Sequence, residues 1–130
     1  MVNGAGLALA TIDLMKDNGL EPADFMDIRP VATREQIATG CALLFANPEV
    51  KAILVNIYGG GILRCDTIAE GIALTCKRQG LTIPLVVRAA GTNHELARKI
   101  ILDQGIKATF VGSMGEAVET LKKTVKREAA

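Results

Sequence analysis

Aromatic residues are the scarcest component of this 130-residue chain. It has no tryptophan, one tyrosine (Tyr58) and three phenylalanines (Phe25, Phe45 and Phe110). The core must therefore be built mainly from Ile, Leu, Val and Ala, which make up most of the 49% hydrophobic content. The scarcity also argues against a flavin-binding electron carrier, because a flavin site needs aromatic or Ser/Thr-rich loops.

The chain also lacks an excess of charge of one sign. Its 15 Lys and Arg residues are balanced by 14 Asp and Glu residues, for a net charge of +1. We therefore expect no nucleic-acid partner, since nucleic-acid-binding proteins usually carry a basic excess. No apolar run approaches the ~20 residues of a membrane span, and the opening MVNGAGLALATID has no basic region typical of a signal peptide.

Cysteine is sparse, and its three positions, Cys41, Cys65 and Cys76, form no CxxC motif. An odd number of cysteines without a neighbouring histidine argues against a disulfide framework or a zinc site. We expect no metal site and a reducing compartment. That compartment is the cytoplasm, or the mitochondrial matrix if the source is a eukaryote.

What is present is an alternation of two hydrophobic periods. Short apolar runs at 25–28, 51–58, 84–90 and 107–112 predict strands buried on both faces. Around them lie five stripes with i, i+3, i+4 spacing, which predict helices near 7–15, 37–45, 65–76, 96–101 and 114–125. The order predicts one α/β domain over residues 1–130, with a parallel sheet of about four or five strands covered by helices on both faces.

The residues between the stripes support these boundaries. Glycines follow three of the predicted helices, where a left-handed residue is expected: Gly19, Gly80 and Gly105. Three residues are candidate N-caps: Thr33, Asn93 and Ser113. Only Met1, Val2 and Asn3 precede the first helix, so we expect a truncated first strand or a chain that is a fragment.

The most unusual loop is YGGGILRCD at 58–66, which follows the most apolar strand and opens a helix. Consecutive glycines let backbone N–H groups approach a ligand, and a helix N-terminus supplies partial positive charge. The loop therefore predicts a phosphate or carboxylate site, with a tight strand–helix turn as the alternative. It matches neither GxGxxG nor a P-loop.

Other candidate residues are single side chains. Asn3, before another helix, offers both a donor and an acceptor to a carboxylate, or else simply starts the helix. Arg88 ends an apolar strand and needs a partner if buried, most simply in an ion pair. We interpret His94, the one histidine, as an exposed helix-start residue and Cys65 as a core residue. We predict no catalytic residue.

Three ordered motifs carry a family resemblance: VNGAGLALATIDL at 2–14, VNIYGGGILRCDTIAEGI at 55–72 and PLVVRAAGTN at 84–93. Over nearly its whole length the chain resembles the carboxy-terminal domain of the succinate–CoA ligase (succinyl-CoA synthetase) β subunit. The malate–CoA ligase β subunit is similar. The resemblance implies a three-layer, flavodoxin-like α/β/α fold. It also implies an αβ enzyme that makes acyl-CoA from an acid, CoA and a nucleoside triphosphate, through an acyl phosphate and a phosphohistidine on the α subunit.

The resemblance also implies site residues. The residues matching the family's contacts to the acid substrate are Asn3, Gly61, Ile62 and Leu63. The residues expected to face the phosphohistidine, at the start of a helix, are Gly60, Gly61, Arg64, Cys65 and Asp66.

Several parts of the complete enzyme are expected outside this chain. They are an α subunit, an ATP-grasp domain, and the sites for ATP or GTP, magnesium and CoA; this chain is expected to hold no cofactor of its own. The expected ligand is a small carboxylic acid. We therefore expect the chain alone to have no ligase activity.

The sequence departs from the family pattern in three places. The loop GGGILRCD is one glycine longer than the family's GGI(M/V)RCD, and DIRPVA at 27–32 replaces a glycine-rich DVGGGA. Pro30 removes a backbone donor there. The family often has an acidic residue where Ala90 stands, whereas the Ala-Gly-Thr-Asn version found here is more similar to malate–CoA ligases. These departures leave the acid open. They also keep a second hypothesis, a stand-alone flavodoxin-like module that binds an anion or a partner without ligase activity.

Overall fold

The computed structural model describes residues 1–58, 64–80 and 82–129. Within these ranges the chain forms five helices and three strands. In chain order they are α1 (Ala5–Asp17), α2 (Arg34–Ala46), β1 (Ile53–Tyr58), α3 (Cys65–Gln79), β2 (Leu85–Ala90), α4 (His94–Leu102), β3 (Ala108–Phe110) and α5 (Met114–Ala129).

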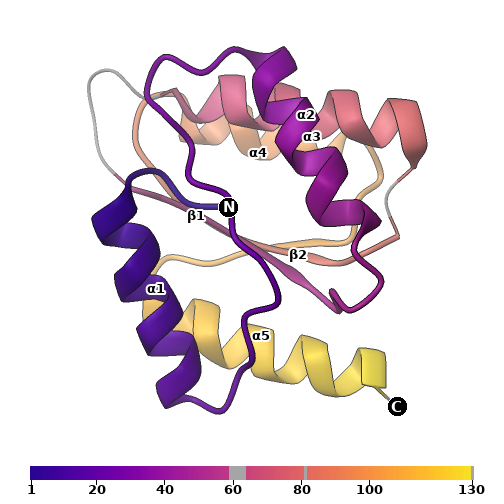
Figure 1. Cartoon of the computed structure of the whole chain (residues 1–130). Helices are drawn as coiled ribbons and strands as arrows, with labels where there is room; N and C mark the ends of the chain where they lie inside the picture. Colours follow the sequence, from indigo (N-terminus) through magenta and orange to yellow (C-terminus); the bar gives the residue numbers. More distant parts are fainter. Residues whose placement is uncertain (59–63, 81, 130) are drawn as a thin grey trace.

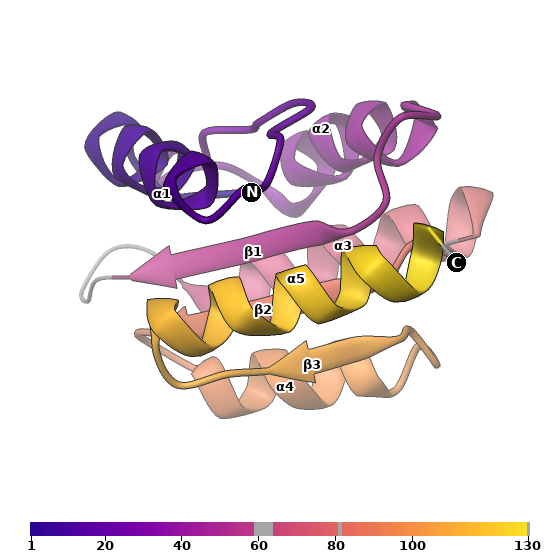
Figure 2. The same ribbon diagram turned by 90° about the horizontal axis from the view of Figure 1, so that it is seen from below.

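The strands form a parallel sheet in the order β1-β2-β3. Helices α2, α3 and α4 cover one face, and α1 and α5 cover the other (Figure 1). Seen from below, α5 lies in front of β2 and α1 lies beside β1 (Figure 2). This confirms the predicted α/β class with helices on both faces, an arrangement consistent with a flavodoxin-like fold.

The prediction of a strand at 25–28 is wrong, because these residues form no strand in the structure. Only Asp27 bridges to the sheet, and its partner is Val2, which also bridges to Asn56 of β1. Two backbone hydrogen bonds hold this segment, from Val2 N to Met26 O (2.9 Å) and from Ile28 N to Val2 O (2.7 Å). Val2, which bridges to both, lies between this segment and β1. The order across the sheet is therefore Asp27, Val2, β1, β2 and β3.

Each face of the sheet has its own core. The larger cluster joins alternate strand residues to α2, α3 and α4, and includes Val55, Ile57 and Val87. The smaller cluster joins the intervening residues, Leu54 and Val86, to α5. Strand β1 is buried from Ile53 to Ile57 because both of its faces are covered.

Most boundary signals act as expected, but Asn93, a predicted N-cap, precedes α4 without a side-chain capping hydrogen bond. Gly19, Gly80 and Gly105 have positive φ angles of 77°, 72° and 70°. The side chain of Thr33 accepts from Gln36 N, while the Gln36 side chain accepts from Thr33 N, which completes a capping box at α2. At α5, Ser113 Oγ accepts from Glu116 N, but the Glu116 carboxylate accepts from Gly112 N.

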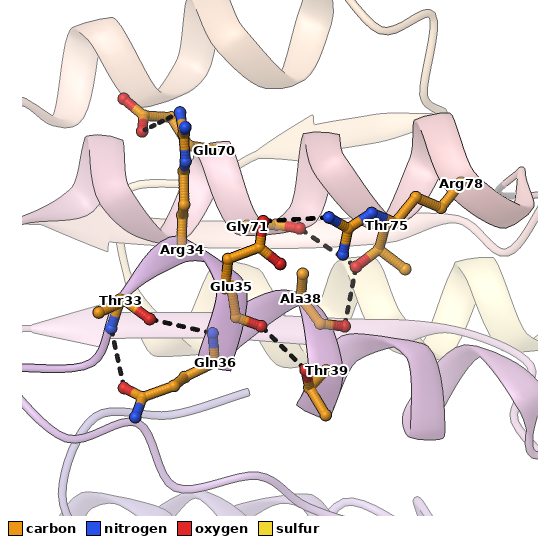
Figure 3. A network of polar contacts seen from close by, with 10 residues as sticks. All are labelled: Thr33, Arg34, Glu35, Gln36, Ala38, Thr39, Glu70, Gly71, Thr75 and Arg78. Carbon is orange, nitrogen blue, oxygen red and sulfur yellow. Dashed lines mark hydrogen bonds and ion pairs between the residues drawn. The ribbon is translucent and has the colours of Figure 1, made fainter.

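Helices α2 and α3 make a close contact at Gly71 (Figure 3). A Cβ atom added there would lie 2.5 Å from Ile37 Cγ2 and 3.1 Å from Arg34 O. Beside it, the buried Thr75 Oγ1 donates to Ala38 O (3.0 Å). Glycine is therefore required at this position by the approach of the neighbouring helix.

We expect Gly71→Ala to destabilise the chain by about 1–3 kcal/mol, the usual cost of overpacking a core. The matched control is Gly115→Ala in α5, where the nearest atom to an added Cβ is Ser113 Oγ at 3.9 Å. We expect that control to be neutral or stabilising, because alanine favours helix over glycine. Urea unfolding curves measure both. Equal stability of the two variants would contradict the close contact.

Candidate functional site

The candidate site residues lie at the carboxyl edge of the parallel sheet. Tyr58 and Ala90 are register partners, so β1 and β2 end together. The segments that follow them meet at that edge, because Arg64 bridges to Thr92. In open parallel α/β sheets this edge is where ligands bind.

Asn3 is bound to the end of β1. Its Nδ2 donates to Tyr58 O (2.7 Å) and its Oδ1 accepts from Tyr58 N (2.8 Å). The side chain thereby extends the sheet in place of a backbone. An asparagine amide can make up to two further hydrogen bonds, so Asn3 is held in place and still has capacity for a ligand.

The start of α3 is anchored on the turn after β2. Arg64 is the N-cap residue and gives no side-chain cap. Cys65 N donates to Thr92 O (3.0 Å). Arg64 donates two hydrogen bonds to Asp66, from Nε to Oδ1 (3.2 Å) and from Nη2 to Oδ2 (2.7 Å). The first turn of α3 therefore already holds one carboxylate and its counter-charge.

The two acidic groups in this turn have shifted pKa values. Burial alone would raise the pKa of Asp66, but hydrogen bonds from Arg64 and Asn93 outweigh it, so the pKa is lowered. Burial raises the pKa of the Cys65 thiol, and the Asp66 charge raises it further. Cys65 lies in the larger core cluster, which confirms our interpretation of it as a packing residue.

Arg88 lies on the same edge without the ion pair that we expected. Its Nη1 donates to Asn56 Oδ1 (3.2 Å), and its guanidinium carbon lies 4.6 Å from the centre of the Tyr58 ring. Asn56 is fully buried and donates in turn to Thr11 Oγ1 (2.9 Å). In the described residues, Arg88 Nε is buried with no hydrogen-bond partner.

Four predicted site residues, Gly60, Gly61, Ile62 and Leu63, lie outside the described residues, as does the extra glycine of their loop. The structure brings Arg64, Cys65 and Asp66 together at the start of α3, while Asn3 lies at the end of β1. The roles of all these residues toward substrate and phosphate stay predictions.

The sequence reasoning missed one neighbour of α3. A small hollow of about 50 Å³ beside the start of α3 is lined by Arg29, Pro30, Arg64 and Thr67, among others. In the sequence, the Arg29-Pro30 segment indicates only the loss of a backbone donor at Pro30. No sequence signal indicated that this segment carries a second arginine to α3, because the two lie far apart in the chain.

A larger cavity of about 350 Å³ lies elsewhere. It is lined by α1, residues 19–25 and the beginning of β1, and no predicted site residue borders it. The described part of the chain contains no cluster of three or more potential metal-binding His, Cys, Asp or Glu residues. None of the described helices is both long and apolar enough to cross a bilayer.

Comparison with known proteins assigns the family. The sequence profile of the CoA-ligase family matches residues 1–125. The chain belongs to the CoA-ligase family. It is 47% identical over 126 residues to the β subunit of the ADP-forming succinate–CoA ligase of Bradyrhizobium diazoefficiens, covering 97% of this chain and 31% of that subunit. The corresponding subunit of Paramagnetospirillum magneticum is 46% identical over 129 residues, with 99% and 32% covered.

The fold agrees with this family. An ATP citrate lyase structure from Methanothrix soehngenii, in complex with citrate and coenzyme A, superposes with a TM-score of 0.78 at 18% identity. It covers 97% of this chain and 35% of the lyase chain. This CoA-ligase domain spans about a third of the length of the curated β subunits that it matches. The family resemblance inferred from the three motifs is therefore confirmed.

The ion pair at α3 predicts an acid-dependent stability. The pKa of Asp66 is lower in the folded chain than in the unfolded chain, so its contribution is present above about pH 4 and is lost as the pH falls through the folded value. We expect Asp66→Asn to lower the free energy of unfolding at pH 7 by about 1–2 kcal/mol. The deficit should shrink in acid.

Urea unfolding at pH 7 and at pH 3 measures this dependence. The control is Glu35→Gln, which removes an ion pair with Arg78 whose two side chains are both more than half exposed. We expect a smaller effect from this control, because exposed pairs contribute little. A deficit of Asp66→Asn that stays constant from pH 7 to pH 3 contradicts the assigned direction of the shift.

Proposed function

We propose that this chain serves as the CoA-ligase domain of the β subunit of a nucleoside-diphosphate-forming acid–CoA ligase. In that role Asn3, with Gly61, Ile62 and Leu63, contacts the acid substrate. The start of α3, with Gly60, Gly61, Arg64, Cys65 and Asp66, faces the phosphohistidine of the α subunit. The family match over residues 1–125 supports the class of enzyme.

The single observation that carries the phosphate role is the surroundings of the start of α3. Arg29 and Arg64 line the same hollow beside it. Asp66 neutralises one arginine, so one positive charge remains with the backbone N–H groups of the first turn. A phosphoryl group approaching this end meets a cation and an uncapped helix N-terminus.

Partners and cofactors follow from the same role. The complete enzyme requires an α subunit and an ATP-grasp domain, which bring the sites for ATP or GTP, magnesium and CoA. The chain itself contributes contacts to the acid and to the phosphoryl group. We propose a cytoplasmic location, in keeping with the bacterial β subunits that the chain matches.

The alternative is a binding module without ligase activity, and the same turn supplies an observation in its favour. Asp66 is only 4% exposed and accepts two hydrogen bonds from Arg64. A carboxylate in the first turn already satisfies part of the helix's preference for negative charge. Such a turn suits a partner surface as well as a phosphate.

A chimera separates the two functions. The matching 126-residue region of the Bradyrhizobium diazoefficiens β subunit is replaced by this chain, and the chimera is co-expressed with the α subunit of that species. We expect formation of succinyl-CoA from succinate, CoA and ATP. The same β subunit without the region, and this 130-residue chain alone, should form none.

Whether the chimera binds the α subunit decides how a lack of acyl-CoA formation is interpreted. Gel filtration shows whether the chimera binds the α subunit. A chimera that assembles but forms no acyl-CoA favours the module over the ligase. Acyl-CoA formation by the chain alone contradicts the division of labour that we propose.

A further inference from the structure

Asn93 has an unusual backbone conformation for a residue that carries a side chain. It is the one described residue other than glycine with a positive φ, at φ 61° and ψ 31°. This left-handed region is strained for residues with a Cβ atom, although asparagine tolerates it better than most. A glycine would adopt the same conformation without strain. We therefore expect the side chain of Asn93 to make a contact that glycine could not make.

The side chain of Asn93 does not serve the helix that it precedes. Asn93 is the N-cap residue of α4, but its side chain makes no capping hydrogen bond to that helix. Its amide instead donates a hydrogen bond to the carboxylate of Asp66, in the first turn of α3. The contact therefore joins the starts of two helices that follow different strands, α4 after β2 and α3 after β1.

The residue before Asn93 holds the same turn of α3 through its backbone. Thr92 O accepts a hydrogen bond from Cys65 N (3.0 Å), and Thr92 also bridges to Arg64. Thr92 and Asn93 together therefore contact three consecutive residues at the start of α3. Attachments at neighbouring positions restrict both the rotation and the translation of this turn relative to the edge of the sheet.

The place of the Asp66 carboxylate matters because it is an anion at the end of the helix expected to face a phosphoryl group. The favourable field of a helix N-terminus is confined to its first turn. A carboxylate that could rotate freely there would compete with a phosphoryl group for the same N–H groups. The side chain of Arg64 is 57% exposed, so solvent competes for its two bonds to Asp66. Asn93 supplies a further bond from a second element of the fold.

We propose that Asn93 is a positioning residue, which holds the Asp66 carboxylate and the first turn of α3 in the geometry required for phosphoryl transfer. This inference rests on the proposed function and deepens it. Asn93 acts through Asp66 and needs no contact of its own with the acid or the phosphoryl group. The left-handed backbone at Asn93 is the strained conformation in which its amide reaches Asp66.

The first test compares turnover with stability. Asn93→Gly keeps the left-handed backbone and removes the amide. In the active chimera we expect its kcat for succinyl-CoA to fall roughly tenfold, in line with loss of a hydrogen bond to a charged group. The KM values for succinate, CoA and ATP should not change. The urea midpoint of the 130-residue variant should stay equal or rise, because glycine relieves the strain.

Two further variants sharpen this test. Asn93→Asp keeps a side chain that tolerates the left-handed region but places a second carboxylate beside Asp66, so its kcat should fall further than that of Asn93→Gly. The matched control is Asn18→Gly. Asn18 follows α1 and also donates from its amide, to Leu14 O (2.8 Å), but α1 covers the opposite face of the sheet from α3 (Figure 1). We expect its kcat to be unchanged.

The second test does not depend on activity. The carboxyl carbon resonance of Asp66 is followed by NMR as the pH is lowered, in the 130-residue chain and in its variants. We expect a higher pKa of Asp66 in Asn93→Gly, because a hydrogen bond to the charged form is lost. The pKa should not change in Asn18→Gly. An equal pKa of Asp66 with and without the Asn93 amide overturns the proposal.

The two tests also separate this inference from the proposed function. A chimera that assembles but is inactive with Asn93 intact contradicts the ligase function, and the role of Asn93 in turnover falls with it. An active chimera whose kcat is the same in Asn93→Gly keeps the ligase function and overturns the positioning role alone. A joint fall of kcat and urea midpoint in Asn93→Gly also overturns that role, because it shows that Asn93 only stabilises the fold.

Discussion

The parallel pairing of β1 with β2 is the constraint on which the rest of the structure depends. Six consecutive register pairs, from Ile53 with Leu85 to Tyr58 with Ala90, fix where both strands end. Because both faces of β1 are covered, its side chains alternate between two separate cores. A slip of one residue would move every side chain to the wrong core. The edge on which the candidate site lies is therefore set by core packing.

Two arginines on that edge show how position decides the state of a charge. Arg64 precedes α3 and forms a bidentate ion pair with Asp66, which lies two residues further along the chain. Arg88 comes from a strand, where neighbours in sequence point to opposite faces, so its contacts are Asn56 and Tyr58 from the adjacent strand. The same type of side chain is paired with a carboxylate in one place, and in the other it contacts an amide and an aromatic ring.

Much of the architecture was predictable because it rests on local rules. The helices follow from their apolar spacing, and the ends of α1, α3 and α4 follow from Gly19, Gly80 and Gly105. The prediction of a strand at 25–28 was wrong, because an apolar run does not show how many residues pair with it. In the structure Asp27 bridges only to Val2. The site was predictable in part: Asn3 and the start of α3 came from motifs, whereas Arg29 and the bonds of Arg88 did not.

The sequence by itself determined the fold class, the number and order of the helices, the family and the segments that form the edge of the sheet. These depend on periodicity, turn residues and motifs, which are properties of neighbouring positions. The tertiary structure alone decided the partners of the polar groups: Asn3 with Tyr58, Asn56 with Thr11, and Arg88 without a carboxylate among the described residues. Those contacts join residues far apart in the chain, and only the packing of the strands and helices brings them together.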